Sequence, residues 1–503
     1  MAPFSKKSLE GPFVLALDIG TSSTRAFLFD RWGRPVEGAE ARHSYEIRTT
    51  TQGASEGDPD LLLDLTRRCV DEVMARSDVL IQEVVGVGVC TFVGNILGVD
   101  AAGQVMTPLF TYADTRAEGE VAGLQTELDE EAVHDRTGCH FHPAYLPAFF
   151  RWFARAKPEL FRQVARWVTL GEYLELKLFG ETSVSYSVAS WSGLLDRRHL
   201  TWDQPLLSVL PVRVDQLSPL TDPHVPRSGL RPEFASRWPT LSRIPWFPAI
   251  GDGAAANIGS GCVSPDRMAL TMGTTTALRA VIEHPVDHIP YGLWCYRVDG
   301  RRSLPGGALS EGGSVFAWMR ENLKLGEPAQ VEAALAAMAP DSHGLTILPF
   351  FAGERSPGLR GDARATLHGL SLATRPIDIV RAGLEAVAYR VALVYALLRP
   401  LLPKDPEIVA GGGALLRSPA WLQIMADVLG RPIAVSEVQE VSGRGTALLA
   451  LEALGLWKDL KEAPHLIGRT YHPNMDHHAR YLKAMERQKN LYEKIVEPHG
   501  LSP

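Results

Sequence analysis

A strand–turn–strand unit occurs twice in this chain of 503 residues, once near the N-terminus and once just past the middle. The first copy runs from an apolar stretch ending at Asp18 through Gly20-Thr21-Ser22 into a second apolar stretch. The second copy places Gly273-Thr274-Thr275 between two apolar stretches in the same register. Short apolar runs bounded by Gly and small polar residues predict two β-hairpins. Chance can make two glycine turns alike, but an internal duplication with two facing domains explains more of the chain.

Both turns have the chemistry of a phosphate site. Glycine lets a ligand approach the backbone closely, and the N–H and hydroxyl groups that follow it can donate hydrogen bonds to phosphate oxygens. We therefore expect phosphate contacts from Gly20, Thr21, Ser22, Gly273, Thr274 and Thr275. Asp18 stands just before the first turn, where a carboxylate suits Mg²⁺, which keeps several waters and takes one or two carboxylates plus phosphates. The alternative for Asp18 is a carboxylate that caps its own turn.

A carboxylate between two glycines lies between the two hairpins, in the segment Gly251-Asp252-Gly253. The small residues after it predict a helix, so Asp252 would stand at a helix start and face the cleft between the two domains. There it could act as a general base that accepts the proton of an attacking hydroxyl during phosphoryl transfer. An isolated Gly-Asp-Gly is usually only a turn; its position between the hairpins favours the catalytic interpretation.

A third turn without side chains follows a predicted strand that begins at Glu407, and it contains Gly411, Gly412 and Gly413. Ser418 as N-cap and Pro419 at the first helical position then predict a helix. A bare strand-to-helix turn suits a flat base or ribose lying against the backbone, and a packing turn is the alternative. The chain contains neither the GxGxxG fingerprint nor a P-loop.

Alternating strand and helix patterns indicate an α/β fold, and the length favours two or three domains. The composition becomes Pro-rich near residues 220–250, so we predict domains at 12–245 and 246–480. The net charge of -7 argues against a broad nucleic-acid surface. No apolar run is long enough to suggest a membrane span. Five scattered cysteines fit a reducing cytoplasm better than a disulfide framework.

Taken in order, these stretches resemble the FGGY family of carbohydrate kinases from about residue 12 to about residue 455. The resemblance is carried by LALDIGTSSTRAFLFD, TYADTRA, AIGDGAAANIGSG, LTMGTTTALRAV, LSEGGSVFAWMR, FFAGERSP, IVRAGLEAVAYR and IVAGGGALLRSPAWLQIMADVLGRPI. It implies two ribonuclease-H-like domains of the actin/hexokinase/Hsp70 type around a cleft that closes on a sugar and MgATP. It also implies Asp252 as the base, Asp18 near the metal, Thr21, Gly273 and Thr274 at the phosphates, and Gly412 and Gly413 near the adenosine.

Within the family, TYADTRAEG, RTGCHFHPAYLPA and GEYLELKLFG look most like the gluconokinases. The implied reaction converts D-gluconate and ATP to 6-phosphogluconate and ADP, with Asp114, Arg116 and His142 beside Asp252 on the sugar side. For Arg116 the alternative is an ion pair with Asp114 or Glu118. For the protein the alternatives are a xylulokinase or another pentulose or polyol kinase, a non-catalytic actin-like binder of sugar or nucleotide, and a sugar-independent ATPase. A cytoplasmic enzyme is expected, and a homodimer is one assembly that the prediction allows.

Two positions depart from the family pattern. Many gluconokinases and xylulokinases have a histidine after the strand that ends near Cys90, where this chain has Gly94. Asn95 could replace the lost sugar contact, or the pocket could accept a different polyol. The second departure is Arg444, in a segment that is usually rich in Ala and Gly, where a structural role is one option.

Overall fold

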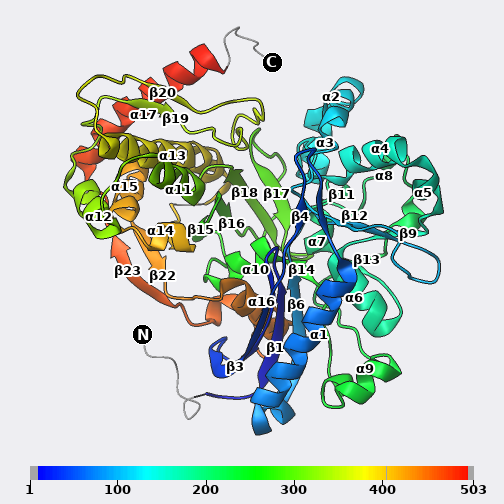
Figure 1. Cartoon of the computed structure of the whole chain (residues 1–503). Helices are drawn as coiled ribbons and strands as arrows, with labels where there is room; N and C mark the ends of the chain where they lie inside the picture. The colour runs from blue at the N-terminus through cyan, green and yellow to red at the C-terminus, as the bar shows by residue number, and fades with distance from the viewer. Residues whose placement is uncertain (1–8, 404, 497–503) are drawn as a thin grey trace.

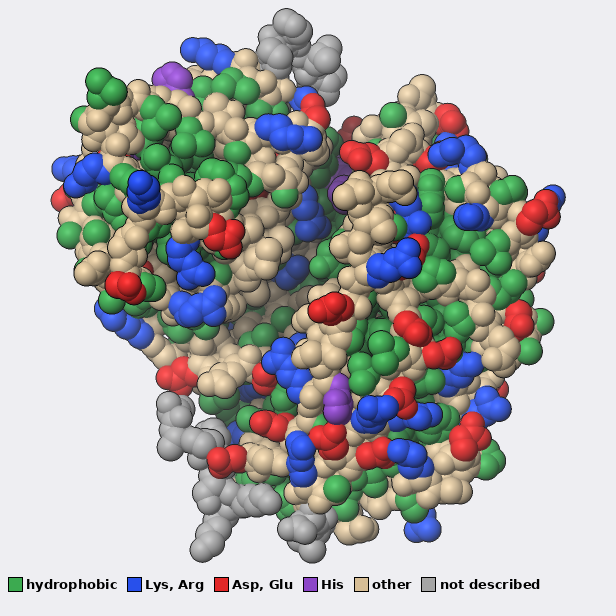
Figure 2. Space-filling model, viewed as in Figure 1, with side chains coloured by type: hydrophobic (Ala, Val, Ile, Leu, Met, Phe, Trp, Pro, Cys, Tyr) green, Lys and Arg blue, Asp and Glu red, His purple; other side chains and the backbone are tan. Residues whose placement is uncertain are grey.

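The computed structural model describes residues 9–403 and 405–496. These residues form two α/β lobes, each built around its own β-sheet (Figure 1). The space-filling view shows a cleft that runs down between the lobes to the middle of the molecule (Figure 2). Within the described part of the chain, no helix has the length and apolar character needed to cross a bilayer. All five cysteines are buried free thiols.

The first sheet has five strands in the order β14-β6-β1-β2-β3. Its strands are β1 (Phe13–Ile19), β2 (Ser23–Phe29), β3 (Pro35–Ser44), β6 (Val84–Thr91) and β14 (Ile250–Gly251). β1 pairs antiparallel with β2 and parallel with β6, so the first predicted hairpin is present. Helix α1 (Pro59–Arg76) packs on β2 and β3, and α16 (Val441–Ala453) packs on β1 and β6. A helix from the second half of the chain therefore covers one face of the first sheet.

The second sheet has seven strands in the order β17-β18-β16-β15-β21-β22-β23. They are β15 (Arg267–Met272), β16 (Thr276–Ala280), β17 (Trp294–Arg297), β18 (Ser303–Leu309), β21 (Glu407–Gly411), β22 (Ile433–Ser436) and β23 (Ile467–Tyr471). β15 pairs antiparallel with β16 and parallel with β21, which repeats the arrangement of β1, β2 and β6. This repeat of topology is the expected result of an internal duplication.

The remaining elements cover the two sheets and extend each lobe outward (Figure 1). On the second lobe lie α11 (Gly313–Asn322), α12 (Pro328–Ala337), β19 (Thr346–Leu348), β20 (Thr366–His368), α13 (Pro376–Leu398), α14 (Gly413–Leu416), α15 (Pro419–Leu429) and α17 (Met475–Ile495). On the first lobe lie β4 (Arg48–Thr49), β5 (Ser55–Gly57), β7 (Leu97–Val99), β8 (Leu109–Phe110), α2 (Glu118–Glu127), α3 (Glu130–Thr137), α4 (Leu146–Ala156), α5 (Pro158–Gln163), β9 (Arg166–Val168), α6 (Leu170–Phe179), β10 (Val184–Ser185), α7 (Tyr186–Ser190), β11 (Leu195–Asp196), β12 (Thr201–Trp202), α8 (Gln204–Leu207), β13 (Leu220–Thr221) and α9 (Pro232–Arg237).

The chain passes from the first sheet to the second later than residue 245. β14, at residues 250–251, still pairs with β6 in the first sheet, and α10 (Asp252–Gly259) follows it directly. The sheet pairing therefore places the crossover after Gly251. The domain limits at 12–245 and 246–480 stay a prediction.

Helices α10 and α16 cross with their backbones in contact. A methyl group at Gly259 would overlap the Val441 carbonyl oxygen, and one at Gly445 would overlap the Ala255 carbonyl oxygen. Only glycine permits so close an approach of two helices at these two positions. One hydrophobic cluster around the crossing joins residues of both halves, among them Val14, Phe27, Ile258 and Leu448.

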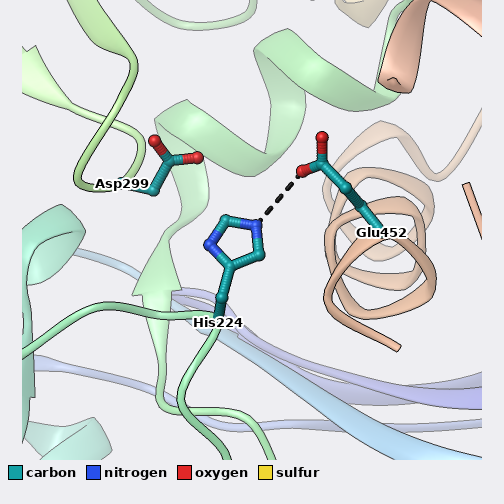
Figure 3. Close-up of side chains that lie close together, drawn as sticks. All are labelled: His224, Asp299 and Glu452. Atoms are coloured by element: carbon teal, nitrogen blue, oxygen red, sulfur yellow. Dashed lines mark hydrogen bonds and ion pairs between the residues drawn. The ribbon is translucent and has the colours of Figure 1, made fainter. Parts of the chain in front are cut away.

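A buried charge cluster joins three distant segments near the end of α16. His224, Asp299 and Glu452 approach one another closely enough to suggest a metal site (Figure 3). However, Arg302 already pairs with both carboxylates, at 2.7 Å from Asp299 and 2.6 Å from Glu452. The ring of His224 bonds Asp222 at 2.7 Å and Glu452 at 3.1 Å. We therefore interpret the group as an ion-pair cluster that ties the 222–224 loop and the β17–β18 hairpin to α16.

Charge in this cluster makes the stability of the protein depend on pH. Burial opposes the charged ring of His224, but its hydrogen bonds to Asp222 and Glu452 raise its pKa to about 9. A raised pKa contributes stability that is complete below the unfolded value of about 6.5 and is lost as pH rises through the folded value. In urea unfolding, we expect the loss of stability in His224→Gln to be largest at pH 6 and to shrink toward pH 10. His199→Gln, at the surface, is the matched control; a difference that grows with pH would contradict the assignment.

Candidate active site

The first phosphate turn is held from both sides. The Gly20 N–H donates to the Ser23 carbonyl at 3.0 Å, which closes the turn. Tyr45 donates from its N–H to the Ser22 carbonyl at 3.1 Å and from its hydroxyl to the Gly20 carbonyl. Thr21 is partly exposed and Ser22 fully so. The backbone is therefore fixed while the turn remains accessible from the cleft.

The second phosphate turn is held by the start of α11. The Gly273 carbonyl accepts from the Gly313 N–H at 2.8 Å, and the Thr274 carbonyl accepts from the Ser314 N–H at 3.2 Å and from its hydroxyl at 2.9 Å. Gly273, Thr274 and Thr275 are all exposed. Each turn is thus anchored through its carbonyls and presents its small residues to solvent.

The three glycines lie beside the second turn. β21 is parallel to β15 with Thr271 opposite Gly411, so Gly411 and Gly273 come at the same edge of the sheet. Gly412 has a φ of 88°, and a methyl group there would overlap the Met272 carbonyl oxygen. Two backbone segments therefore meet at this edge, one suited to phosphate and one to a flat ring.

Asp18 is buried, with 1% of its surface exposed. Its carboxylate lies 2.9 Å from the Arg25 guanidinium, yet neither oxygen accepts a well-formed hydrogen bond. Burial raises its pKa, against the opposing charge of Arg25. A carboxylate with unsatisfied oxygens next to the first turn has the donor chemistry of a Mg²⁺ site, so the residues fit the expected metal.

Asp252 is the first residue of α10 and follows β14, whose Gly251 stands opposite Thr91 of β6. Its Oδ1 accepts from the Gly253 N–H at 2.7 Å. Burial and the neighbouring charge of Asp18 raise the pKa of Asp252 to about 6. A carboxylate with a pKa close to neutrality that is still ionised at pH 7 is suited to accept a proton.

Aromatic rings surround the start of α10. A methyl group at Gly251 would lie 2.9 Å from the Trp191 indole nitrogen, so Trp191 packs directly against this segment. The Trp191 ring stacks on Tyr296 with centroids 3.5 Å apart, and the Tyr296 hydroxyl lies 2.6 Å from that of Tyr145. These contacts build one wall of the space beside Asp252.

Two partly exposed arginines lie beside the same space, and the charge of Asp252 acts on one of them, Arg279. The Arg279 guanidinium lies over Trp191 at 5.8 Å and that of Arg355 over Trp294 at 5.4 Å. In the described part of the chain, neither guanidinium forms a salt bridge, and Nε of Arg355 is buried without a hydrogen-bond partner. Figure 2 shows Lys or Arg side chains in the depth of the cleft. Positive charge thus gathers beside the Asp252 carboxylate.

His142 lies close enough to Arg355 for the charge of that arginine to act on its ring. Its Nδ1 accepts from the Ala144 N–H at 3.1 Å. Burial, reinforced by the charge of Arg355, lowers the pKa of His142 to about 3, so the ring is neutral at pH 7. A neutral imidazole can donate or accept one hydrogen bond to a hydroxyl.

Asp114 and Arg116 are bound to each other. Arg116 lies 2.5 Å from Asp114 and 2.7 Å from Glu56, and its guanidinium lies over Trp152 at 4.6 Å. Asp114 also accepts from the Ser55 N–H at 3.1 Å. The ion pair considered as the alternative for Arg116 is therefore present, and these contacts give Arg116 a role in holding the β5–β8 region together. A sugar contact from either residue stays a prediction.

The presence of glycine at position 94, where many related kinases have histidine, has a steric explanation. Gly94 has a φ of 66°, and a methyl group there would lie 2.8 Å from Cβ of Tyr112. The side chain of Asn95 is buried, donating to the Phe92 carbonyl at 2.5 Å and accepting from the Leu170 N–H at 2.8 Å. Both ends of the Asn95 amide therefore make hydrogen bonds within the fold, and a sugar contact from Asn95 stays a prediction.

Sequence reasoning did not single out several residues of this space, namely Tyr112, Trp191, Arg279, Tyr296 and Arg355. Three of them lie inside stretches that carried the family resemblance: Tyr112 in TYADTRA, Arg279 in LTMGTTTALRAV and Arg355 in FFAGERSP. Their place inside these stretches was the signal that the sequence offered. A cavity of about 1070 Å³ lies elsewhere, lined by His134, Tyr291, Tyr389 and Tyr492 among others and by none of the predicted site residues.

Comparison with known proteins shows the family to which this chain belongs. Residues 13–259 match the N-terminal domain of the FGGY family of carbohydrate kinases, and residues 268–454 match its C-terminal domain. The chain is similar to the gluconokinase of Bacillus subtilis (strain 168), with 27% identity over 470 residues and 91% of each chain covered. Among solved structures it is similar to a gluconate kinase and a ligand-bound xylulose kinase, both from Lactobacillus acidophilus. The TM-score is 0.88 for the gluconate kinase and 0.89 for the xylulose kinase. Each is 26% identical in sequence, and each alignment covers 96% of this chain and 98% of the other chain.

The fold and these matches define a phosphotransferase built from two ribonuclease-H-like domains of the actin/hexokinase type around a cleft, which confirms the predicted fold class. The chain belongs to the FGGY family of carbohydrate kinases. The gluconokinase-like resemblance is also confirmed at the level of sequence similarity.

A substitution at Gly412 tests whether the turn at residues 411–413 needs a glycine for its backbone conformation. Gly412→Ala forces a side chain into a backbone conformation reserved for glycine, which costs on the order of 1–3 kcal/mol, and it drives Cβ into the Met272 carbonyl. We expect a lower free energy of unfolding in urea and weaker ATP binding by calorimetry. Gly411→Ala is the matched control for stability, because a methyl group at Gly411 meets no atom within 4 Å. Equal unfolding midpoints for the two variants would contradict this account.

Proposed function

We propose that the protein is an ATP- and Mg²⁺-dependent kinase that phosphorylates the terminal hydroxyl of a sugar acid, with D-gluconate as the best candidate. The product would be 6-phosphogluconate, and Asp252 would be the general base. Family membership supports kinase activity on a carbohydrate. The choice of acceptor needs a separate argument, since the similar proteins include both gluconate and xylulose kinases.

The pair of unpartnered arginines carries the proposal of an acidic acceptor. Arg279 and Arg355 are partly exposed and form no salt bridge within the described residues, so both guanidinium groups are available to bind an anionic acceptor. A carboxylate is bound well by such planar donors, often through two parallel hydrogen bonds. A neutral ketose or glycerol would leave both charges uncompensated. D-Gluconate supplies a carboxylate at one end and a hydroxyl for transfer at the other.

On the donor side, the proposal assigns the ATP phosphates to the turns at Gly20–Ser22 and Gly273–Thr275, and the adenosine to Gly411–Gly413. The exposed small residues of the two turns support this assignment. When bound, Mg²⁺ would supply positive charge that offsets the charge of the transferred group. Asp18 would hold it, directly or through water.

The chemistry on the acceptor side follows from Asp252. Its carboxylate accepts the proton of the terminal hydroxyl as the oxygen attacks the γ-phosphorus, so the proton leaves the hydroxyl and the phosphoryl group leaves ADP. His142 would donate from Nε2 to an acceptor hydroxyl, because its Nδ1 already accepts from the Ala144 N–H, and the aromatic wall at Trp191 would keep water away from the reacting group. Exclusion of water favours transfer to the sugar over hydrolysis. A cytoplasmic setting fits the five free thiols, and a homodimer stays a prediction.

Removal of the base is the direct test of mechanism. Asp252→Asn is expected to lower kcat about 10²- to 10⁴-fold while ATP binding by calorimetry changes little. In the wild type, kcat/KM for the acceptor should fall as pH drops below about 6, where Asp252 becomes protonated. Asp215→Asn, on the exposed surface, serves as the control. A near-normal kcat for Asp252→Asn would remove Asp252 from the role of base.

The acceptor is tested with a panel and with charge-removing variants. Coupled assays with gluconate, xylulose, ribulose, glycerol and sedoheptulose should give the highest kcat/KM with gluconate. Arg279→Gln and Arg355→Gln should each lower kcat/KM for gluconate about 10- to 100-fold, since a hydrogen bond to a charged group contributes roughly 1.5–3 kcal/mol. The effect on neutral acceptors should be much smaller.

Arg213→Gln is the matched control, because Arg213 is exposed and lies in a pair with Asp215. A preference for xylulose or another neutral sugar would replace the gluconate assignment with the pentulose or polyol kinase alternative. ATP consumption that is independent of every acceptor would support a sugar-independent ATPase, and no turnover at all would support a non-catalytic binder.

A further inference from the structure

Arg444 is a buried arginine in the helix that joins the two lobes. It lies in α16, where the sequence departs from the family pattern, and only 1% of its surface is exposed. Its neighbour Gly445 forms the backbone contact with α10. Arg444 therefore sits at the crossing that supports the helix carrying Asp252.

The Arg444 guanidinium binds three main-chain carbonyls from three parts of the fold. It donates to Gly259 at 2.6 Å, to Gly33 at 3.1 Å and to Pro464 at 2.6 Å. Gly259 ends α10, Gly33 lies in the β2–β3 turn of the first lobe, and Pro464 precedes β23 of the second lobe. The same side chain thus links α10 to both lobes.

These bonds are unusual for a buried cation, because all three acceptors are neutral carbonyls. Burial lowers the pKa of Arg444 to about 10, which reflects the cost of holding the charge away from water. The carbonyls at the end of α10 carry the negative end of the helix dipole, where a cation is favourable. The β2–β3 turn is also pressed onto α16, since a methyl group at Gly33 would lie 2.8 Å from Leu448 and 3.4 Å from Nε of Arg444.

We propose that Arg444 is a positioning residue that sets the depth of Asp252 in the cleft by holding the far end of α10 against both lobes. α10 is a rigid helix of eight residues with Asp252 at one end and the bonded Gly259 carbonyl at the other. A shift at Gly259 is transmitted along the helix to the carboxylate. The proposal rests on the proposed role of Asp252 as base.

The test is Arg444→Met, which keeps the apolar stem and removes all three hydrogen bonds. With the best acceptor of the panel, we expect kcat to fall about 10- to 100-fold, as for a misplacement of roughly 1 Å between reacting groups. ATP binding by calorimetry should stay within about twofold of the wild type, because the phosphate turns are held by Tyr45 and Ser314 instead.

Arg381→Met is the matched structural control. Arg381 is equally buried and donates to the Leu335 carbonyl, Glu385 and Tyr481, all within the second lobe. Arg381→Met should lower the unfolding midpoint. At temperatures where the variant is still folded, its kcat should equal that of the wild type. A fall in kcat that is the same for Arg381→Met and Arg444→Met would overturn the proposal.

Two further measurements separate positioning from loss of folded enzyme. In the double variant Asp252→Asn/Arg444→Met, kcat should be no lower than in Asp252→Asn alone, because Arg444 acts through Asp252. If the two substitutions lower kcat independently, so that their fold-losses multiply, the proposal is contradicted. Guanidinium ion at millimolar concentration should restore kcat of Arg444→Ala and not of Arg381→Ala.

If Arg444→Met does not fold, Arg444→Lys replaces it, with an intermediate loss of kcat expected. Failure of the base assignment is seen separately, as full activity of Asp252→Asn itself.

Discussion

The backbone contact between α10 and α16 is the constraint on which the rest of the structure depends. Gly259 and Gly445 let the two helices touch at their main chains, so the short α10 can lie between both sheets. A side chain at either position would separate the helices and move Asp252 relative to both phosphate turns. The hydrophobic cluster around the crossing includes residues of both halves, so the lobes share a core beside the helix that begins at Asp252.

Several charged side chains outside the cleft are paired with opposite charges. Arg116 is neutralised by Asp114 and Glu56, and Arg302 by Asp299 and Glu452. By contrast, Arg279 and Arg355 form no salt bridge within the described residues, although the charge of Asp252 acts on Arg279, and the oxygens of Asp18 lack well-formed hydrogen bonds. Unsatisfied charge costs free energy in a folded protein and is therefore concentrated where a ligand compensates it.

The parts of the site that could be predicted are those set by local sequence. Two apolar runs around a small turn define a hairpin wherever they occur, so Gly20 and Gly273 were found from the residues alone. Asp252 at a helix start and the turn at Gly412 follow from the same short-range patterns. Arg279 and Arg355 could not be found this way, because their significance comes from what is missing around them in space. For Arg116, its neighbour Asp114 was named as a partner, while Glu56 came from a distant segment.

The donor and acceptor sides of the cleft are built from different parts of the chain, and this difference explains why the acceptor is the harder prediction. Phosphate turns use main-chain groups fixed by carbonyl anchors, so many side-chain changes leave them intact. The acceptor space is shaped by side chains such as Trp191, Arg279 and Arg355. Gly94 belongs to this second group: its positive φ and its contact with Tyr112 exclude a side chain there. A histidine at that point is excluded, and the polar side chains that remain around this space are His142, Arg279 and Arg355.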